Sequence, residues 1–185
     1  MNGQWNLEVL YKGFDDPTFE EDLAALKEKV SAFAAFTEKL AETEALDGLR
    51  SGIGQQECIQ KLAMKLAGYA SLRQAADTRN PEAGSHMGRV MAVLAGLAAP
   101  MAAFESWASK LPGLMELVMS DETLKEYEFL FANMADSSRY LLPGIGEAVM
   151  AKMRMSGGDA WGELQQYLTS TVPVSYRGGT TNLSS

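Results

Sequence analysis

The chain has 185 residues, 46% of them hydrophobic and 22% charged, a balance that indicates one folded domain and disfavours a disordered chain. Its formal net charge of −8 disfavours nucleic acid and anionic membrane surfaces as partners, because both attract concentrated positive charge. The single cysteine cannot form an internal disulfide and the first residues do not resemble a signal peptide, so we expect a cytoplasmic protein.

Residues that commonly carry catalysis are scarce. One histidine and one cysteine are too few for a Cys/His zinc site, and the sequence lacks His-Glu-x-x-His, the phosphate-binding Gly-x-x-x-x-Gly-Lys-Ser/Thr loop and the Gly-x-Ser-x-Gly elbow. We interpret Cys58, beside Ile59, as a small core residue, and His86 as a polar residue in the first turn of a helix. The sequence therefore predicts no catalytic, cofactor-binding or metal-binding residue.

The first predicted elements are an apolar arm, residues 5–16, and a long amphipathic helix. The arm is rich in aromatic and aliphatic side chains, which favours packing onto the body of the protein. Asp16-Pro17 predicts the helix start, with Asp16 as the N-cap and Pro17 at the first helical position. Apolar residues then recur in steps of three and four, at Phe19, Leu23, Leu26, Val30, Phe33, Phe36 and Leu40.

Glycines predict a break after this helix, at Gly48 and again in Gly52-Ile53-Gly54. A second helix is expected over residues 55–77. Its apolar face consists of Ile59, Leu62, Leu66 and Tyr69. Because the residue before a proline is disfavoured in a helix, the next helix should begin at Pro81, with Asn80 as its cap.

The most apolar stretch of the chain, residues 82–111, has no charge between Arg89 and Glu105. We predict a central helix that is kinked near Pro100 and buried on every face, because a helix that is apolar all round must be surrounded by protein. A membrane span is the alternative. We disfavour it because the uncharged run is shorter than the roughly 18 to 20 residues that crossing requires.

The remaining segments alternate between helix and turn. Helices are expected over residues 121–142, 147–155 and 159–168, and the methionines of the second are interpreted as core filling. After Thr171 the composition favours a strand, a turn at Arg177-Gly178-Gly179 and the start of another strand. The predicted fold class is all-α, an antiparallel helical bundle or array with a short β-like extended segment at the C-terminal end.

Three separated segments carry a family pattern. They are Trp5-Asn6-Leu7-x-x-Leu10-Tyr11 with Asp15-Asp16-Pro17, then Tyr69-Ala70-Ser71-Leu72-Arg73 with Asp77-Thr78-Arg79-Asn80-Pro81-Glu82-Ala83, and last Gly157-Gly158-Asp159-Ala160-Trp161 through Leu164 with Leu168-Thr169-Ser170-Thr171. In order and spacing they resemble the N-terminal part of oligoendopeptidase F, a cytosolic zinc metallopeptidase of the thimet oligopeptidase superfamily. The stretch 139–147 departs from that family, because it lacks the usual histidine and most of the acidic residues.

The resemblance implies a helical N-terminal domain, residues 1–170, followed by an extended segment, 171–185, that leads into a catalytic domain missing from this chain. Zinc and its His-Glu-x-x-His ligands would belong to that missing domain, so no cofactor is expected here. The expected partners are the chain's own C-terminal catalytic domain and short peptide substrates, with no nucleic acid and no membrane. The domain would form one wall of a channel that admits short peptides and excludes folded proteins.

The residues alone leave a second function open. A stand-alone helical module could hold a protein partner through an acidic surface or through the Met-rich face around residues 150–155. An amphipathic bundle serves either purpose, so the choice between the two rests on the resemblance.

Overall fold

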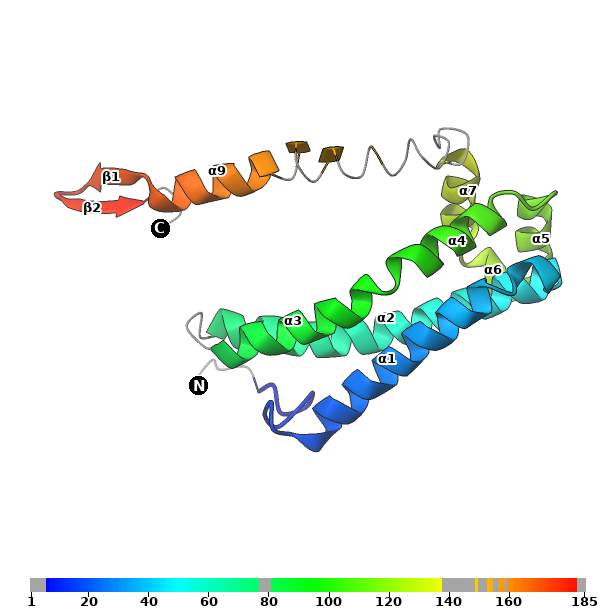
Figure 1. Ribbon diagram of the computed structural model, residues 1–185, viewed down its shortest axis with the longest axis horizontal. Coiled ribbons are helices and arrows are strands. Elements are labelled where there is room, and N and C mark those ends of the chain that lie inside the picture. The colour runs from blue at the N-terminus through cyan, green and yellow to red at the C-terminus, as the bar shows by residue number, and fades with distance from the viewer. Residues whose placement is uncertain are drawn as a thin grey trace. The chain divides into compact units, whose positions relative to one another are not determined.

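The protein is all-α, with a small antiparallel sheet near its C-terminal end (Figure 1). The computed structural model describes residues 6–76, 81–137, 149, 153–154, 157–158 and 160–182. Contacts between residues divide the chain into two compact units, Met1–Ser138 and Arg139–Ser185. The predicted fold class is confirmed. The predicted boundary at residue 170 stays a prediction, because compact units need not coincide with domains.

Helix α1 (Pro17–Thr37) forms as the sequence predicts. The Oδ1 atom of Asp16 accepts a hydrogen bond from the backbone N–H of Thr18 at 3.0 Å, and Pro17 occupies the first turn. The apolar stripe is buried at Phe19, Leu23, Leu26, Val30 and Phe33, and it continues at Leu40 in the short 3₁₀ helix η1 (Leu40–Glu42). The stripe is the core-facing side of the helix.

The N-terminal arm, which is described over residues 6–16, also packs as predicted. Tyr11 and Phe14 are buried against the start of α1 and the far half of the next helix. The ring of Tyr11 lies edge-on to Phe19 and to Tyr69, with centroids 5.1 Å apart in each case. Aromatic packing of this kind fixes the arm on the helices.

Helix α2 (Ala45–Ala76) runs through the glycines, so the predicted break is wrong. Two of these glycines leave room for aromatic side chains from another helix. A Cβ atom built on Gly48 would lie 2.5 Å from Cη2 of Trp107, and one built on Gly52 would overlap the ring of Phe104. Two aromatic side chains from another helix therefore rest directly on the backbone of α2, a close approach that glycine alone permits. Local propensity predicted the opposite because it carries no information on this packing.

The predicted central helix is two helices, α3 (Pro81–Ala95) and α4 (Ala98–Ala108). The interruption lies at Gly96 and Leu97 instead of at Pro100, which α4 accommodates in its first turn, where no helical donor is lost. Burial on every face is also wrong. Within the described residues, α3 buries Ala83 and Val90, and α4 buries Phe104 and Ala108. One side of this stretch packs on the unit and the other side remains exposed.

The stretch Pro81–Ala108 is long and apolar enough to cross a membrane, and 11% of its most apolar window is buried inside the protein. One such stretch is weak evidence, because the criterion uses length and composition only. The expectation of no membrane partner stays a prediction.

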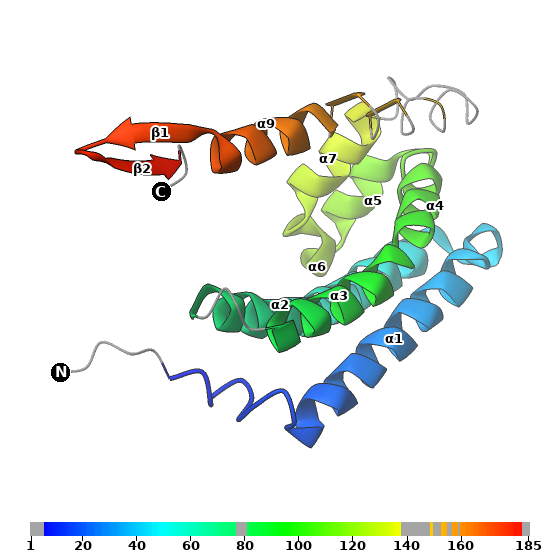
Figure 2. The same ribbon diagram turned by 60° about the vertical axis from the view of Figure 1, so that its left-hand side comes forward.

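Helices α1, α2 and α3 lie side by side, and α2 runs antiparallel to both neighbours (Figures 1 and 2). Charged pairs link them across the interfaces. Nζ of Lys65 on α2 lies 2.7 Å from Oδ2 of Asp22 on α1, and the guanidinium of Arg89 on α3 bonds both carboxylate oxygens of Glu20 at 2.5 and 2.6 Å. Two-pronged pairing of this kind fixes orientation as well as distance.

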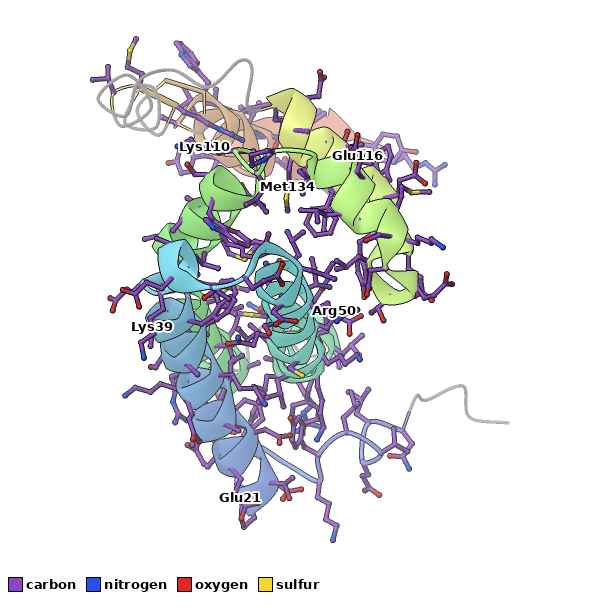
Figure 3. All side chains as sticks on the ribbon, turned by 90° about the vertical axis from the view of Figure 1, so that its right-hand side faces the viewer. Glu21, Lys39, Arg50, Lys110, Glu116 and Met134 are labelled. Carbon is purple, nitrogen blue, oxygen red and sulfur yellow. The ribbon has the colours of Figure 1, made fainter. Side chains whose placement is uncertain are left out.

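Helix α5 (Leu114–Ser120) was not predicted. The single helix predicted over 121–142 is two shorter ones, α6 (Glu122–Lys125) and α7 (Glu128–Ser137), and the residues that follow Ser137 lie outside the described part until Val149. Asp121 caps α6, since its Oδ1 accepts hydrogen bonds from the backbone N–H groups of Thr123 and Leu124. Asp121 is almost fully buried, and Nε of Arg50 donates to its Oδ2 at 2.7 Å. Figure 3 labels Arg50 on α2, the helix that supplies this partner of Asp121.

The second unit contains α9 (Ala160–Thr171), β1 (Pro173–Tyr176) and β2 (Gly179–Asn182). The strands pair antiparallel, with Val174 opposite Thr181, and the turn residues Arg177 and Gly178 both have positive φ, at 48° and 81°. Two positive φ values match the twist of a tight hairpin. The predicted helix and hairpin are therefore confirmed. The Met-rich helix 147–155 falls largely outside the described residues, and Met153 within it is exposed instead of core filling.

Candidate functional site

A groove lies on the described part of the first unit, between the N-terminal arm and the C-terminal half of α2. Its volume is about 770 Å³ and it is open to solvent. The lining residues are Asn6, Leu7, Glu8, Tyr11, Lys12, Tyr69, Leu72, Arg73, Ala75 and Ala76. We call it the arm groove. Its walls come from two segments about 60 residues apart in sequence, so it exists only because the arm is docked.

A partly buried hydrogen-bond network holds the arm wall in place. The hydroxyl of Tyr11 donates to Oδ2 of Asp22 at 2.7 Å, and Nζ of Lys65 donates to the same oxygen at 2.7 Å. Nζ of Lys65 also lies 4.5 Å from the ring centroid of Tyr11, within range of a cation–π interaction. The arm, α1 and α2 thus meet at one carboxylate.

The network shifts two pKa values. Burial and the Asp22 carboxylate raise the pKa of the Tyr11 hydroxyl well above its usual range, so it stays a donor. Burial alone would raise the pKa of Asp22, but the hydrogen bonds from Lys65 and Tyr11 outweigh it and lower that pKa. Both shifts favour the same arrangement, in which a neutral tyrosine donates to an ionised aspartate.

His86 belongs to the support of the arm. Its ring stacks on Phe14 with centroids 4.4 Å apart and planes 6° apart, and it meets Phe19 edge-on at 5.0 Å. Burial, followed by the charge of Arg89, lowers the pKa of His86, so the neutral ring is favoured. The residue lies in the second turn of α3 instead of the predicted first turn, and its partners are aromatic instead of solvent.

The two cationic side chains of the arm groove form no ion pair in the part of the chain that the structure describes. No carboxylate within those residues lies within 4.0 Å of the Lys12 ammonium or the Arg73 guanidinium. The guanidinium of Arg73 lies 6.0 Å from the ring centroid of Tyr69. Tyr69 is 1% exposed as a residue, and no described residue forms a hydrogen bond with its hydroxyl. The hydroxyl oxygen is not fully buried, because the one fully buried side-chain polar atom without a partner among the described residues is Nε2 of Gln56.

A second hollow shares Lys12 and Arg73 but differs in charge. It is also lined by Asp15, Glu82 and His86, so its cations face carboxylates across a small space. In the arm groove the same two cations are accompanied by one carboxylate, that of Glu8. Lys12 and Arg73 therefore line both hollows.

Cys58 is exposed, so its interpretation as a core residue is wrong. On a helix, neighbouring residues point about 100° apart, and Ile59 takes the buried direction. The thiol lies at a shallow groove with Lys29, Ala32, Ser51, Gly54 and Gln55. Nothing about this thiol indicates catalysis.

The described residues contain no group of three or more His, Cys, Asp or Glu side chains that could hold a metal ion. The expectation that this chain holds no metal stays a prediction.

The second unit presents apolar surface. On α9 the side chains of Trp161, Leu164 and Leu168 share one helical face, and Trp161 is 71% exposed. Val172 and Tyr176 of the following segment are also exposed. An amphipathic helix normally buries such a face, so this surface is suited to contact with further protein.

Sequence reasoning missed the arm groove entirely. Tyr69 and Arg73 stand four residues apart on α2, the spacing that places two side chains on one helical face, and this is the one local signal that could have paired them. Lys12 has no such signal, because its place depends on how the arm docks. Comparison with protein-family models, with curated proteins and with solved structures gave no significant match.

Proposed function

We propose that this chain is the helical, non-catalytic N-terminal domain of a zinc metalloendopeptidase resembling oligoendopeptidase F, and that it forms part of the channel that admits short peptides. One observation carries the proposal beyond the resemblance. Large apolar side chains on α9, with Trp161 71% exposed, share one face and have no cover in the described part of the second unit. That is the surface expected of a segment that packs against a further domain.

The size of the second unit supports this reading. A two-stranded hairpin is marginally stable in water by itself, and it needs packing against other structure to persist. Here the hairpin follows directly on α9, and Val172 and Tyr176 are exposed along it. Contact with a catalytic domain would cover the helix face and stabilise the hairpin at the same time.

The chemistry would come from the catalytic domain. Amide hydrolysis in such enzymes uses a zinc ion and a general base acting on water. The role of this chain is to bind and orient peptides and to exclude large substrates, a contribution through position and access.

The first test is to read the coding sequence past Ser185. An open reading frame that reaches a His-Glu-x-x-His codon pattern supports the peptidase. A stop codon directly after Ser185 contradicts it and favours the alternative, a stand-alone helical interaction module.

The second test is enzymatic. Three preparations are assayed on a quenched fluorogenic peptide with zinc present: this chain, the remainder of the enzyme, and the intact protein. We expect turnover by the intact protein, none by this chain, and a large loss of peptide turnover in the remainder even though it retains the zinc ligands. Zinc-dependent turnover by this chain, or full activity in the remainder, would contradict the proposed role.

A further inference from the structure

We infer that the arm groove is a binding site for the free C-terminal carboxylate of a short peptide with an apolar last residue. This inference rests on the proposed function, because it takes the ligand to be a peptide of the kind that such an enzyme cleaves. It goes further by placing one subsite on named residues of this chain. Three features carry it: two cations, one hydroxyl without a hydrogen-bond partner among the described residues, and an apolar wall.

The two cations give the groove the opposite sign to the protein as a whole. The chain carries a net charge of −8, yet Lys12 and Arg73 line the groove against the single carboxylate of Glu8. The ring of Tyr69 lies beneath the guanidinium of Arg73 at 6.0 Å, which restricts where the guanidinium can go. An arginine presents paired N–H donors that match the two oxygens of a carboxylate.

The hydroxyl of Tyr69 is the second feature. Tyr69 lines the groove and is 1% exposed, and among the described residues nothing donates to its hydroxyl or accepts from it. The hydroxyl oxygen itself is not among the fully buried unpaired atoms of the described residues, where Nε2 of Gln56 is the one such atom, so it is free to meet water or a ligand in the groove. A carboxylate oxygen would accept a hydrogen bond from this hydroxyl.

The third feature is the apolar wall that selects the rest of the ligand. Leu7, Leu72, Ala75 and Ala76 line the same groove beside the charged groups. A ligand with a carboxylate next to an apolar side chain would satisfy both parts at once. The C-terminal residue of a peptide, when it is leucine or phenylalanine, has that composition.

The experiment is calorimetric titration of the 185-residue chain with acetyl-Ala-Ala-Leu-Phe, first as the free acid and then as the C-terminal amide. We expect the free acid to bind at least about tenfold more tightly than the amide, since hydrogen bonds to a charged group are worth roughly one such factor or more. Equal affinity of acid and amide would overturn the inference. Octanoate, a carboxylate without a peptide, serves as a third ligand, and its binding as tightly as the free acid would also overturn it.

Variants locate the site. Arg73→Gln and Lys12→Gln should each weaken binding of the free acid by about tenfold and leave the amide unchanged. Tyr69→Phe keeps the packed ring and removes only the hydroxyl, with an expected loss of about threefold, as for a single neutral donor. The matched control is Lys39→Gln, because Lys39 lies just beyond the end of α1 that is remote from the arm, whereas Glu21 lies at the near end (Figure 3).

The result of this binding experiment can be told apart from the result of the tests of the proposed function. Circular dichroism of each variant confirms that it is folded before titration. If Arg73→Gln and Lys12→Gln weaken the free acid no more than Lys39→Gln does, the inferred subsite falls, while an active intact peptidase would leave the proposed function standing. A preference for the free acid that is lost in both groove variants supports the subsite, whichever way the reading frame past Ser185 turns out.

Discussion

Helices α1 and α9 have the same kind of apolar pattern, but the apolar face is buried on α1 and exposed on α9. Both have apolar residues in steps of three and four. On α1 those residues are buried, and Phe19, Leu26 and Phe33 are fully enclosed by α2 and its neighbours. On α9 the corresponding face is exposed. Periodicity thus predicts that a helix has an apolar face, but the partner that covers the face is a property of the surrounding chain.

The prediction with the largest expected effect tests the burial of the apolar face of α1. Phe33 is fully buried on α1 and packs near Phe36 and Phe104, with ring centroids 6.1 and 6.2 Å away. Phe33→Ala should lower the free energy of unfolding by about 3 to 5 kcal/mol, because it removes buried contacts and leaves a cavity. Urea unfolding followed by circular dichroism measures this. A loss under about 1 kcal/mol would show that the α1 face is not the core.

The second prediction concerns the glycines of α2. Gly52→Ala should destabilise the protein by about 1 to 3 kcal/mol, because the new methyl group would overlap the ring of Phe104, which is fully buried and has no space to move. Gly54→Ala is the matched control. A Cβ there meets nothing within 4 Å, so the higher helix propensity of alanine should stabilise the protein by about 0.5 to 1 kcal/mol. Effects of equal sign in the two variants would contradict the packing of Phe104 on α2.

These two glycines also show what the sequence can and cannot supply. The start of α1 at Asp16, its buried stripe, and the helix and hairpin of the second unit follow from local patterns, and the structure confirms them. The break expected at Gly52 does not occur, because the rings that require glycine come from α4, about 50 residues away. Long-range packing also determines which side of the 82–111 stretch is buried.

The candidate site was beyond sequence reasoning for the same reason. Lys12 and Arg73 come together only when the arm docks against α2, and the docking depends on Tyr11 reaching Asp22 and Lys65. No local spacing encodes that meeting. The aromatic character of the arm predicts that it packs, but not where it packs.

The third prediction uses the pKa of Asp22. Asp22→Asn should cost about 1 kcal/mol at pH 7, a value kept small because Lys65 is 35% exposed and its attraction is screened. The folded state lowers the pKa of Asp22, so its contribution is complete above the unfolded-state value near 3.9 and is lost as the pH falls through the folded value. The stability gap between wild type and variant should therefore close in acid. A gap that stays constant down to about pH 2 would contradict the network.

The prediction with the smallest expected effect tests the exposure of the apolar face of α9. Trp161→Ala should change the free energy of unfolding of this chain by less than about 1 kcal/mol, because the ring is 71% exposed. A loss of 3 to 5 kcal/mol, as for a core aromatic, would mean that α9 is packed in the isolated chain. Urea unfolding under the conditions used for Phe33→Ala makes the two values comparable.

The most direct test of the proposed contact between α9 and a catalytic domain is hydrogen exchange of α9 in this chain and in the longer protein that the proposal requires. If the exposed face of Ala160–Thr171 is such a contact surface, its amides should exchange readily in the isolated chain and become strongly protected in the longer protein. The amides of α1, which is packed already, should change little and serve as the internal reference. Equal exchange of α9 in the two preparations would contradict the claim.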